Sequence, residues 1–178
     1  MPLIKKNYKI IFFLYLFSIV PSISQSNKGV PLNNLILHKN PKFIAPIIFE
    51  DFSGNEVKLN EYYGDIILIN FWATWCEPCK DEMPSLDSLS MNKNFEHLTI
   101  FAVNMEKPNK KKTKIFFNQI GIKSIEIFFD KNLNFVKEMN LRGVPTTILI
   151  NREGKEFGRI QGSIDFEDKE FKKWLLKQ

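Results

Sequence analysis

The sequence has 178 residues, enough for one domain with a sizeable core and too few for two domains of ordinary size. Hydrophobic residues make up 44% and charged residues 25%, which excludes a disordered, collagenous or disulfide-scaffold chain. The formal net charge is +5, but Lys5, Lys6 and Lys9 precede residue 25 with no acid among them, leaving 22 basic against 20 acidic residues. The small net charge of residues 25–178 argues against a nucleic-acid-binding surface.

Residues 1–24 are predicted to form a signal peptide or a membrane anchor. Three lysines precede an apolar run over residues 10–20, and Pro21, Ser22 and Ser24 follow it. The run has 11 residues, whereas a membrane-crossing helix needs about 20, so cleavage after Ser24 is favoured over an uncleaved anchor. Both readings predict a periplasmic or other extracytoplasmic protein, secreted or tethered, whose dithiol would need a supply of electrons in that oxidising space.

The mature chain is predicted to begin with a tether over residues 25–45, which are polar and carry Pro31 and Pro41. A single domain over residues 46–178 follows, in which strand and helix patterns alternate. This alternation predicts an α/β fold with a mixed central sheet flanked by helices. The expected elements are a hairpin over 47–59, strands over 66–71, 98–103 and 125–129, helices over 77–90, 111–120 and 133–139, a second hairpin over 146–161, and a closing helix over 165–177.

The segment Cys76-Glu77-Pro78-Cys79 lies where the buried strand ends and the first long helix begins. A helix N-terminus favours negative charge, so a thiol placed there ionises more easily and becomes a better nucleophile. The three-residue offset brings both sulfurs onto one helical turn, within reach of a disulfide. We therefore expect Cys76 to attack from an exposed tip and Cys79 to resolve from an inward-facing position.

Other roles of a cysteine pair fit this sequence less well. A structural disulfide that closes so short a loop adds little stability. Zinc takes four ligands, and only His38 and His97 remain as partners, with no ligand-like spacing. Haem attachment needs a histidine directly after the second cysteine, where Lys80 stands. The pattern therefore predicts a redox pair and no bound metal.

Two segments together resemble the TlpA/ResA-like thiol:disulfide oxidoreductases of the thioredoxin superfamily, which are related to the AhpC/TSA redoxins. These segments are residues 71–80 and residues 142–147, whose sequences are FWATWCEPCK and RGVPTT. The resemblance implies a thioredoxin-like fold with an N-terminal β-hairpin extension and an inserted βα unit around residues 98–120. It also implies reduction of extracytoplasmic protein disulfides, such as those of apocytochrome c or copper-site proteins, with electrons from a membrane thiol carrier and no bound cofactor.

The resemblance also assigns roles near the cysteines. Asn70 stands where thioredoxin itself has a buried acid, and Glu82, three residues after Cys79, is similar in place to a functional acid of this branch. First-turn acids are also common as solvated residues, so this alternative role for Glu82 stays open. Pro145 is expected to be cis, which would leave the backbone of Val144 to pair with an extended substrate strand.

The residues around Cys76 also suggest how substrate is contacted and in which direction electrons flow. Trp75, Glu77 and Pro78 are expected to contact substrate, whereas Trp72 belongs either to the site or to the core. The Glu77 carboxylate disfavours the neighbouring thiolate, which favours a reductant by roughly 20 to 30 mV at most. Surface solvation and partner recognition are the other readings of Glu77.

The sequence also leaves two alternative functions and one charged cluster to consider. A peroxiredoxin-like peroxidase shares the expected fold, and a Cu(I)-binding chaperone would combine the thiolates with Met105 or Met139. A basic cluster near residue 110 would face anionic lipid or an acidic partner, or it is a solvated loop and helix start. Its members are Lys107, Lys110, Lys111, Lys112 and Lys114.

Overall fold

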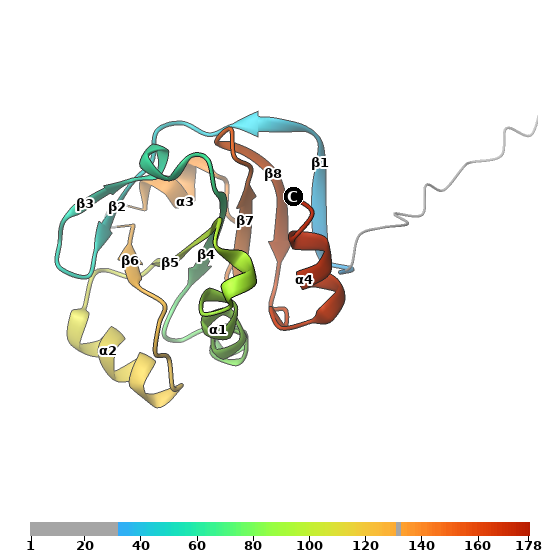
Figure 1. Cartoon of the computed structure of the whole chain (residues 1–178). Coiled ribbons are helices and arrows are strands. Elements are labelled where there is room, and N and C mark those ends of the chain that lie inside the picture. The colour runs from blue at the N-terminus through green and yellow to red at the C-terminus, as the bar shows by residue number, and fades with distance from the viewer. Residues whose placement is uncertain (1–31, 131–132) are drawn as a thin grey trace, which may run out of the picture.

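The computed structural model describes residues 32–130 and 133–178 (Figure 1). The predicted leader and the first part of the predicted tether lie outside the described residues. Within them, no helix is long and apolar enough to cross a membrane.

One eight-stranded mixed sheet forms the centre of the molecule, with strand order β1-β8-β7-β4-β5-β6-β2-β3. Strands β4, β5 and β6 run parallel, and every other neighbouring pair is antiparallel. The strands are β1 (Leu35–Phe43), β2 (Ile48–Asp51), β3 (Glu56–Lys58), β4 (Ile66–Trp72), β5 (Leu98–Asn104), β6 (Ile127–Phe129), β7 (Thr146–Ile150) and β8 (Lys155–Gln161).

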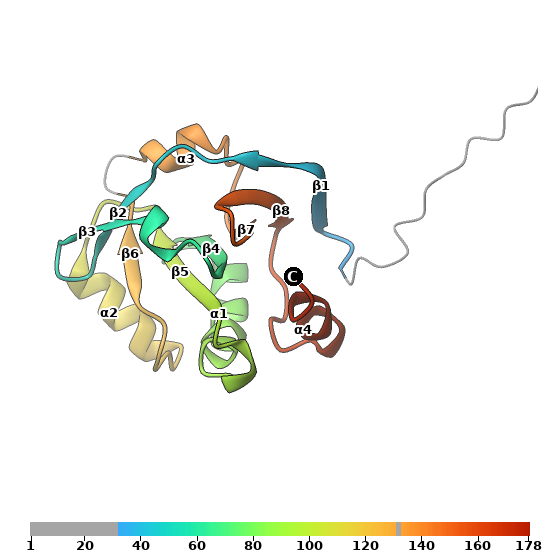
Figure 2. The same ribbon diagram turned by 45° about the horizontal axis from the view of Figure 1, so that its top comes forward.

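Helices cover both faces of this sheet. Figure 2 shows α1, α2 and α4 on one side of it and α3 on the other. The helices are α1 (Glu77–Ser90), α2 (Lys110–Gln119), α3 (Asn134–Glu138) and α4 (Lys169–Leu175), with short 3₁₀ segments η1 (Leu59–Tyr62) and η2 (Lys93–Phe95). The fold class predicted from the sequence, including the hairpin β2–β3 and the unit β5–α2, is confirmed.

Strand β4 is buried on both faces and divides the core into two clusters. Side chains alternate along a strand, so Leu68 and Trp72 belong to the cluster under α1, while Ile67 and Ile69 belong to the cluster under α3. Trp72 is fully buried and its ring stacks on Phe116 of α2, so it is a core residue. Because both faces of β4 are packed against the core, the position of its carboxyl end, and of the residues that follow it, is well defined.

The tether predicted over residues 25–45 is wrong for residues 35–43, which form β1. This strand pairs antiparallel with β8, starting at Leu35 against Ile160. The pairing shifts register between Leu37 and Lys42, the interval that contains Pro41. A proline lacks a backbone donor and is tolerated at a sheet edge, which is where β1 lies. The folded domain therefore begins before residue 46.

Two further boundaries differ from the sequence expectation. The last helix begins at Lys169 instead of residue 165, because the Asp168 side chain accepts a hydrogen bond from the Phe171 N–H and caps it there. Strand β6 covers only the end of the predicted strand, since the backbone N–H groups of Lys123, Ser124 and Ile125 bond to the buried carboxylate of Asp87 on α1. These bonds hold residues 123–125 against α1, so they do not pair with a neighbouring strand and β6 begins only at Ile127.

Candidate active site

The two cysteines lie at the junction between β4 and α1 and are joined by a disulfide with an S–S distance of 2.04 Å. Cys76 is the N-cap of α1, and its sulfur accepts a hydrogen bond from the Cys79 N–H at 3.2 Å. The expectation of an exposed Cys76 is wrong for this disulfide-bonded state, in which Cys76 is 3% exposed and Cys79 fully buried. The disulfide is therefore shielded from solvent in this state.

Reduction would release a thiol at the positive end of a 14-residue helix. The unpaired N–H groups of the first turn and the helix macrodipole favour a thiolate at this place. Pro78 lies in the same turn and needs no hydrogen-bond partner for its nitrogen there. The local backbone therefore prepares Cys76 for nucleophilic attack on a disulfide.

Glu82 is a buried carboxyl group, 2% exposed, on the same face of α1 as Cys79. Its oxygens accept hydrogen bonds from the Asn70 side chain at 2.8 Å and from the Ile164 backbone N–H at 3.2 Å. Burial raises the pKa of Glu82 to about 7, although both hydrogen bonds act in the opposite direction. The alternative of a solvated first-turn acid is therefore wrong, and this group changes charge near neutral pH.

Asn70 holds Glu82 without supplying a charge. It lies on β4 and also donates to the Thr147 hydroxyl at 3.0 Å, while its own carbonyl oxygen has no hydrogen-bond partner among the residues that the structure describes. A neutral amide leaves the buried carboxyl unpaired with any cation, which is why desolvation dominates its pKa. At the position where thioredoxin has a buried acid this chain has the neutral Asn70, and its buried, titratable acid is Glu82 on α1 instead.

The loop before β7 contains the Val144–Pro145 peptide bond, which is cis as expected. The Pro145 carbonyl accepts a hydrogen bond from Gly162 N–H at 2.9 Å, which ties this loop to the end of β8. Thr146 and Thr147 follow directly on β7, the strand that pairs with β4. The second sequence motif is therefore joined to the strand that leads into the cysteine pair.

Three predicted contact residues surround the pair on the outside. Trp75 is 70% exposed, and Glu77 and Pro78 are exposed in the first turn of α1. The Glu77 carboxylate lies 2.5 Å from the Lys80 ammonium group. This ion pair offsets part of the field that Glu77 exerts on Cys76.

One residue that sequence reasoning missed is Glu106, in the loop after β5. It accepts hydrogen bonds from the Thr74 N–H at 2.6 Å and from the Lys112 ammonium at 2.6 Å, which hold its pKa below the usual range although burial acts to raise it. The parallel strands β4 and β5 end at the same edge of the sheet, and this adjacency was the available signal.

The metal-binding alternatives find little support in the geometry. Across residues 32–130 and 133–178, no three His, Cys, Asp or Glu side chains gather into a group that could hold a metal ion. His38 contacts Glu156 at 2.7 Å and His97 lies 3.6 Å from Asp65. Met139 belongs to the core cluster under α3 and Met105 packs against that cluster, whereas both cysteines belong to the cluster under α1.

The fold and the cysteine pair define a thiol-disulfide oxidoreductase with a thioredoxin-like fold. Residues 36–155 match the AhpC/TSA family, and the chain belongs to that family.

Comparison with known proteins agrees with this class. The chain is 36% identical over 108 residues to the thiol-disulfide oxidoreductase ResA of Halalkalibacterium halodurans, covering 61% of this chain and 60% of that protein. It is 32% identical over 121 residues to ResA of Geobacillus kaustophilus, covering 68% of each. The match thus spans 60 to 68% of the length of these relatives.

Solved structures show the same fold. A DsbF homologue from Corynebacterium diphtheriae aligns with a TM-score of 0.69 and 20% identity, covering 86% of this chain and 96% of that one. The thioredoxin domain of a thiol-disulfide oxidoreductase from Bacteroides vulgatus aligns with a TM-score of 0.62 and 22% identity, covering 72% and 93%.

Proposed function

We propose that this protein is an extracytoplasmic protein-disulfide reductase. The observation that carries the proposal is a cysteine pair at the N-terminus of α1, with the buried acid Glu82 on the face of the helix that holds Cys79. The predicted leader supports the location, and the ResA relatives support the reaction class. Apocytochrome c and copper-site proteins are the proposed substrates.

The reaction consists of two thiol–disulfide exchanges. The Cys76 thiolate attacks one sulfur of the substrate disulfide, which forms a mixed disulfide and releases the first substrate thiolate. The Cys79 thiolate then attacks the Cys76 sulfur, which forms the Cys76–Cys79 disulfide and releases the second substrate thiolate. Two electrons pass to the substrate, its thiolates take up two protons, and a membrane thiol carrier returns two electrons to the pair.

In this proposal Glu82 moves a proton for Cys79. A carboxyl group with a pKa of about 7 is partly ionised at neutral pH, so it accepts the Cys79 proton before resolution and returns it when the pair is reduced again. Val144 and Pro145 bind the substrate backbone beside the sulfurs, and exposed Trp75, with Glu77 and Pro78, contacts its side chains. No resident cofactor takes part.

The direct test is to trap the mixed disulfide. The Cys79→Ser variant of the mature chain, reduced and mixed with an oxidised peptide bearing the haem-attachment sequence Cys-x-x-Cys-His, is expected to accumulate a covalent adduct through Cys76. Mass spectrometry under non-reducing conditions measures it. The matched variant Cys76→Ser is expected to give far less adduct, because Cys79 is fully buried inside α1 and does not occupy the N-cap position that favours a reactive thiolate. Equal adduct from both variants, or none from either, would contradict the proposal.

A further inference from the structure

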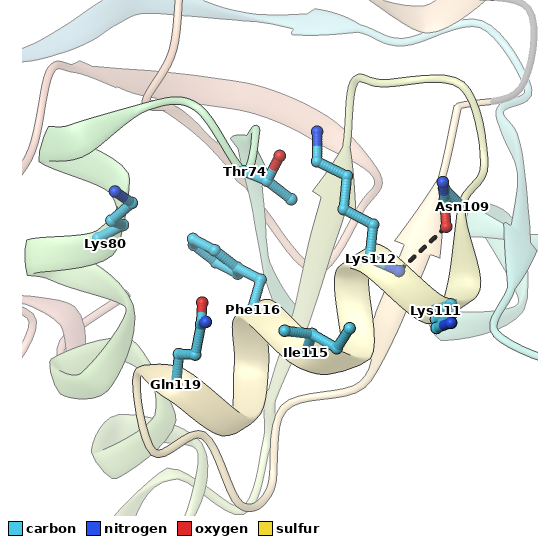
Figure 3. A pocket seen from close by; sticks show the side chains of 8 residues that line it. All are labelled: Thr74, Lys80, Asn109, Lys111, Lys112, Ile115, Phe116 and Gln119. Carbon is cyan, nitrogen blue, oxygen red and sulfur yellow. Dashed lines mark hydrogen bonds between the residues drawn. The ribbon is translucent and has the colours of Figure 1, made fainter.

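A groove with a volume of about 400 Å³ lies between α1 and α2, and its lining includes Thr74 and Lys80, which flank the Cys76–Cys79 segment in the sequence. We call it the α1–α2 groove; its main lining residues are Thr74, Lys80, Lys111, Lys112, Ile115 and Phe116. Figure 3 shows Lys80 on α1 facing the side chains of α2, with Phe116 pointing from α2 into the space between the helices. This volume suits a few side chains of a bound segment.

All charged side chains that line the α1–α2 groove are lysines, namely Lys80, Lys111 and Lys112. Lys80 pairs with Glu77 and Lys112 pairs with Glu106, so two of the three positive charges are partly offset. Lys111 is exposed and makes no ion pair within residues 32–130 and 133–178. Between the lysines, Ile115 is 47% exposed, so the groove combines positive charge with an accessible apolar side chain.

The charge on α2 works against the stability of the helix that carries it. The sequence of α2 is KKKTKIFFNQ, with four lysines at or near its N-terminus and no acid. A helix N-terminus favours negative charge, and cations there are unfavourable. The Asn109 side chain caps α2 by accepting a hydrogen bond from the Lys112 N–H, so stability comes from the cap and from buried Phe116 and Phe117. The helix dipole therefore does not favour lysines at these positions.

Hydrogen bonds join the groove to the active-site loop. The Lys112 ammonium group donates a hydrogen bond to the Glu106 carboxylate. The same carboxylate accepts a hydrogen bond from the backbone N–H of Thr74, two residues before Cys76. The Lys80 backbone N–H donates to the Cys76 carbonyl at 3.3 Å. Both walls of the groove are therefore fixed relative to the sulfur that attacks substrate.

We propose that the α1–α2 groove docks an acidic segment of the protein whose disulfide is reduced, with an apolar side chain of that segment over Ile115 and carboxylates near Lys111. This inference rests on the proposed function and names a chemical class for its substrate. Charge complementarity supports this inference, because each charged side chain that lines the groove is a lysine, and two lining residues, Thr74 and Lys80, flank the Cys76–Cys79 segment. A substrate segment, unlike a flat lipid surface, enters a concave site between two helices.

The test compares two disulfide-linked peptides that are identical except that glutamates flanking the cysteines in one are glutamines in the other. The second-order rate of reaction with the reduced mature chain is measured at low and high salt. The acidic peptide is expected to react about two- to fivefold faster at low salt, with the advantage lost at high salt. Lys111→Glu is expected to abolish or invert this ratio.

Lys173→Glu on α4 is the matched control, since it makes the same charge change at an exposed site outside the groove. It is expected to keep the preference of the parent protein. Thermal unfolding accompanies the rates, and an acid in place of Lys111 at a helix N-terminus is expected not to lower the melting temperature.

The outcomes separate this inference from the proposed function. If the parent protein reduces neither peptide nor a small neutral disulfide, the proposed function fails. If it reduces both peptides at equal rates, or if Lys173→Glu removes the preference as fully as Lys111→Glu, the groove assignment is overturned. Binding to anionic lipid vesicles that Lys111→Glu abolishes, with unchanged peptide rates, would overturn it in favour of a membrane-facing role.

Discussion

Two buried glutamates in this domain, each 2% exposed, have pKa values that shift in opposite directions. Glu156 on β8 contacts Arg159 and His38, whose hydrogen bonds hold its pKa below the usual value although burial acts to raise it. Among the described residues, the partners of Glu82 on α1 are an amide and a backbone N–H, and burial raises its pKa to about 7. Both side chains are shielded from solvent, but Arg159 and His38 bond to Glu156 and lower its pKa, whereas among the described residues no cation bonds to Glu82 and desolvation dominates its pKa.

The largest expected effect comes from breaking the ion pair of Glu156. The substitution Arg159→Met leaves a buried carboxylate without its main cation and removes the hydrogen bond from Arg159 to the Met139 carbonyl. We expect a loss of about 3 to 5 kcal/mol in the free energy of unfolding, measured by urea denaturation of the oxidised protein. Arg142→Met, at an exposed position, is the control and is expected to change it by less than about 0.5 kcal/mol. If Arg159→Met changed the free energy of unfolding as little as Arg142→Met, the ion pair of Glu156 would contribute little to stability.

The opposite pKa shift of Glu82 predicts an opposite dependence of stability on pH. Because its pKa is higher in the folded state, its contribution is complete below about pH 4.5 and is lost as pH rises to about 7. The loss amounts to about 3 kcal/mol across that window. Glu82→Gln is expected to remove this slope in the oxidised protein, whereas Asp81→Asn, at an exposed position of α1, is expected to keep it. Parallel pH profiles for the parent and Glu82→Gln would contradict the assigned burial of a titrating acid.

The same substitution tests whether the acid serves the reaction. Glu82→Gln keeps the size of the side chain and removes the proton-transfer group, so resolution of the mixed disulfide is expected to slow by about a hundredfold near neutral pH. The pH profile of the rate is expected to lose its inflection near 7. Stopped-flow measurement on the reduced mature chain, with Asp81→Asn as the control, reports both quantities. Unchanged rate and thiol titration in Glu82→Gln would remove Glu82 from the mechanism.

The smallest expected effect concerns the exposed acid beside Cys76. Glu77→Gln removes a carboxylate that disfavours the thiolate and leaves Lys80 without its partner, so the reduction potential is expected to rise. The Glu77 side chain is 73% exposed, so the rise is expected to stay below about 30 mV. Equilibration with defined thiol buffers measures the shift, and a fall in the potential would contradict the assigned direction.

Local patterns predicted most of the fold and the position of the cysteine pair. The bounds of α1 are those expected from the sequence, because the helical spacing and Pro78 in its first turn lie close together in the chain. Strand β1 was missed because its strand character comes from pairing with β8, more than a hundred residues later. The burial of Glu82 depends likewise on Asn70 and Ile164, which only the folded chain brings together. Local periodicity carries no information about such distant contacts.

The reduction potential of the Cys76–Cys79 couple shows whether this pair acts as a reductant of its substrates. The purified mature domain is equilibrated with thiol buffers of known potential, and free thiols are counted after alkylation. We expect a value near that of thioredoxin, about −270 mV, as a reductant requires. A value near −120 mV, typical of a strong periplasmic oxidant, would contradict the proposal that this pair reduces its substrates.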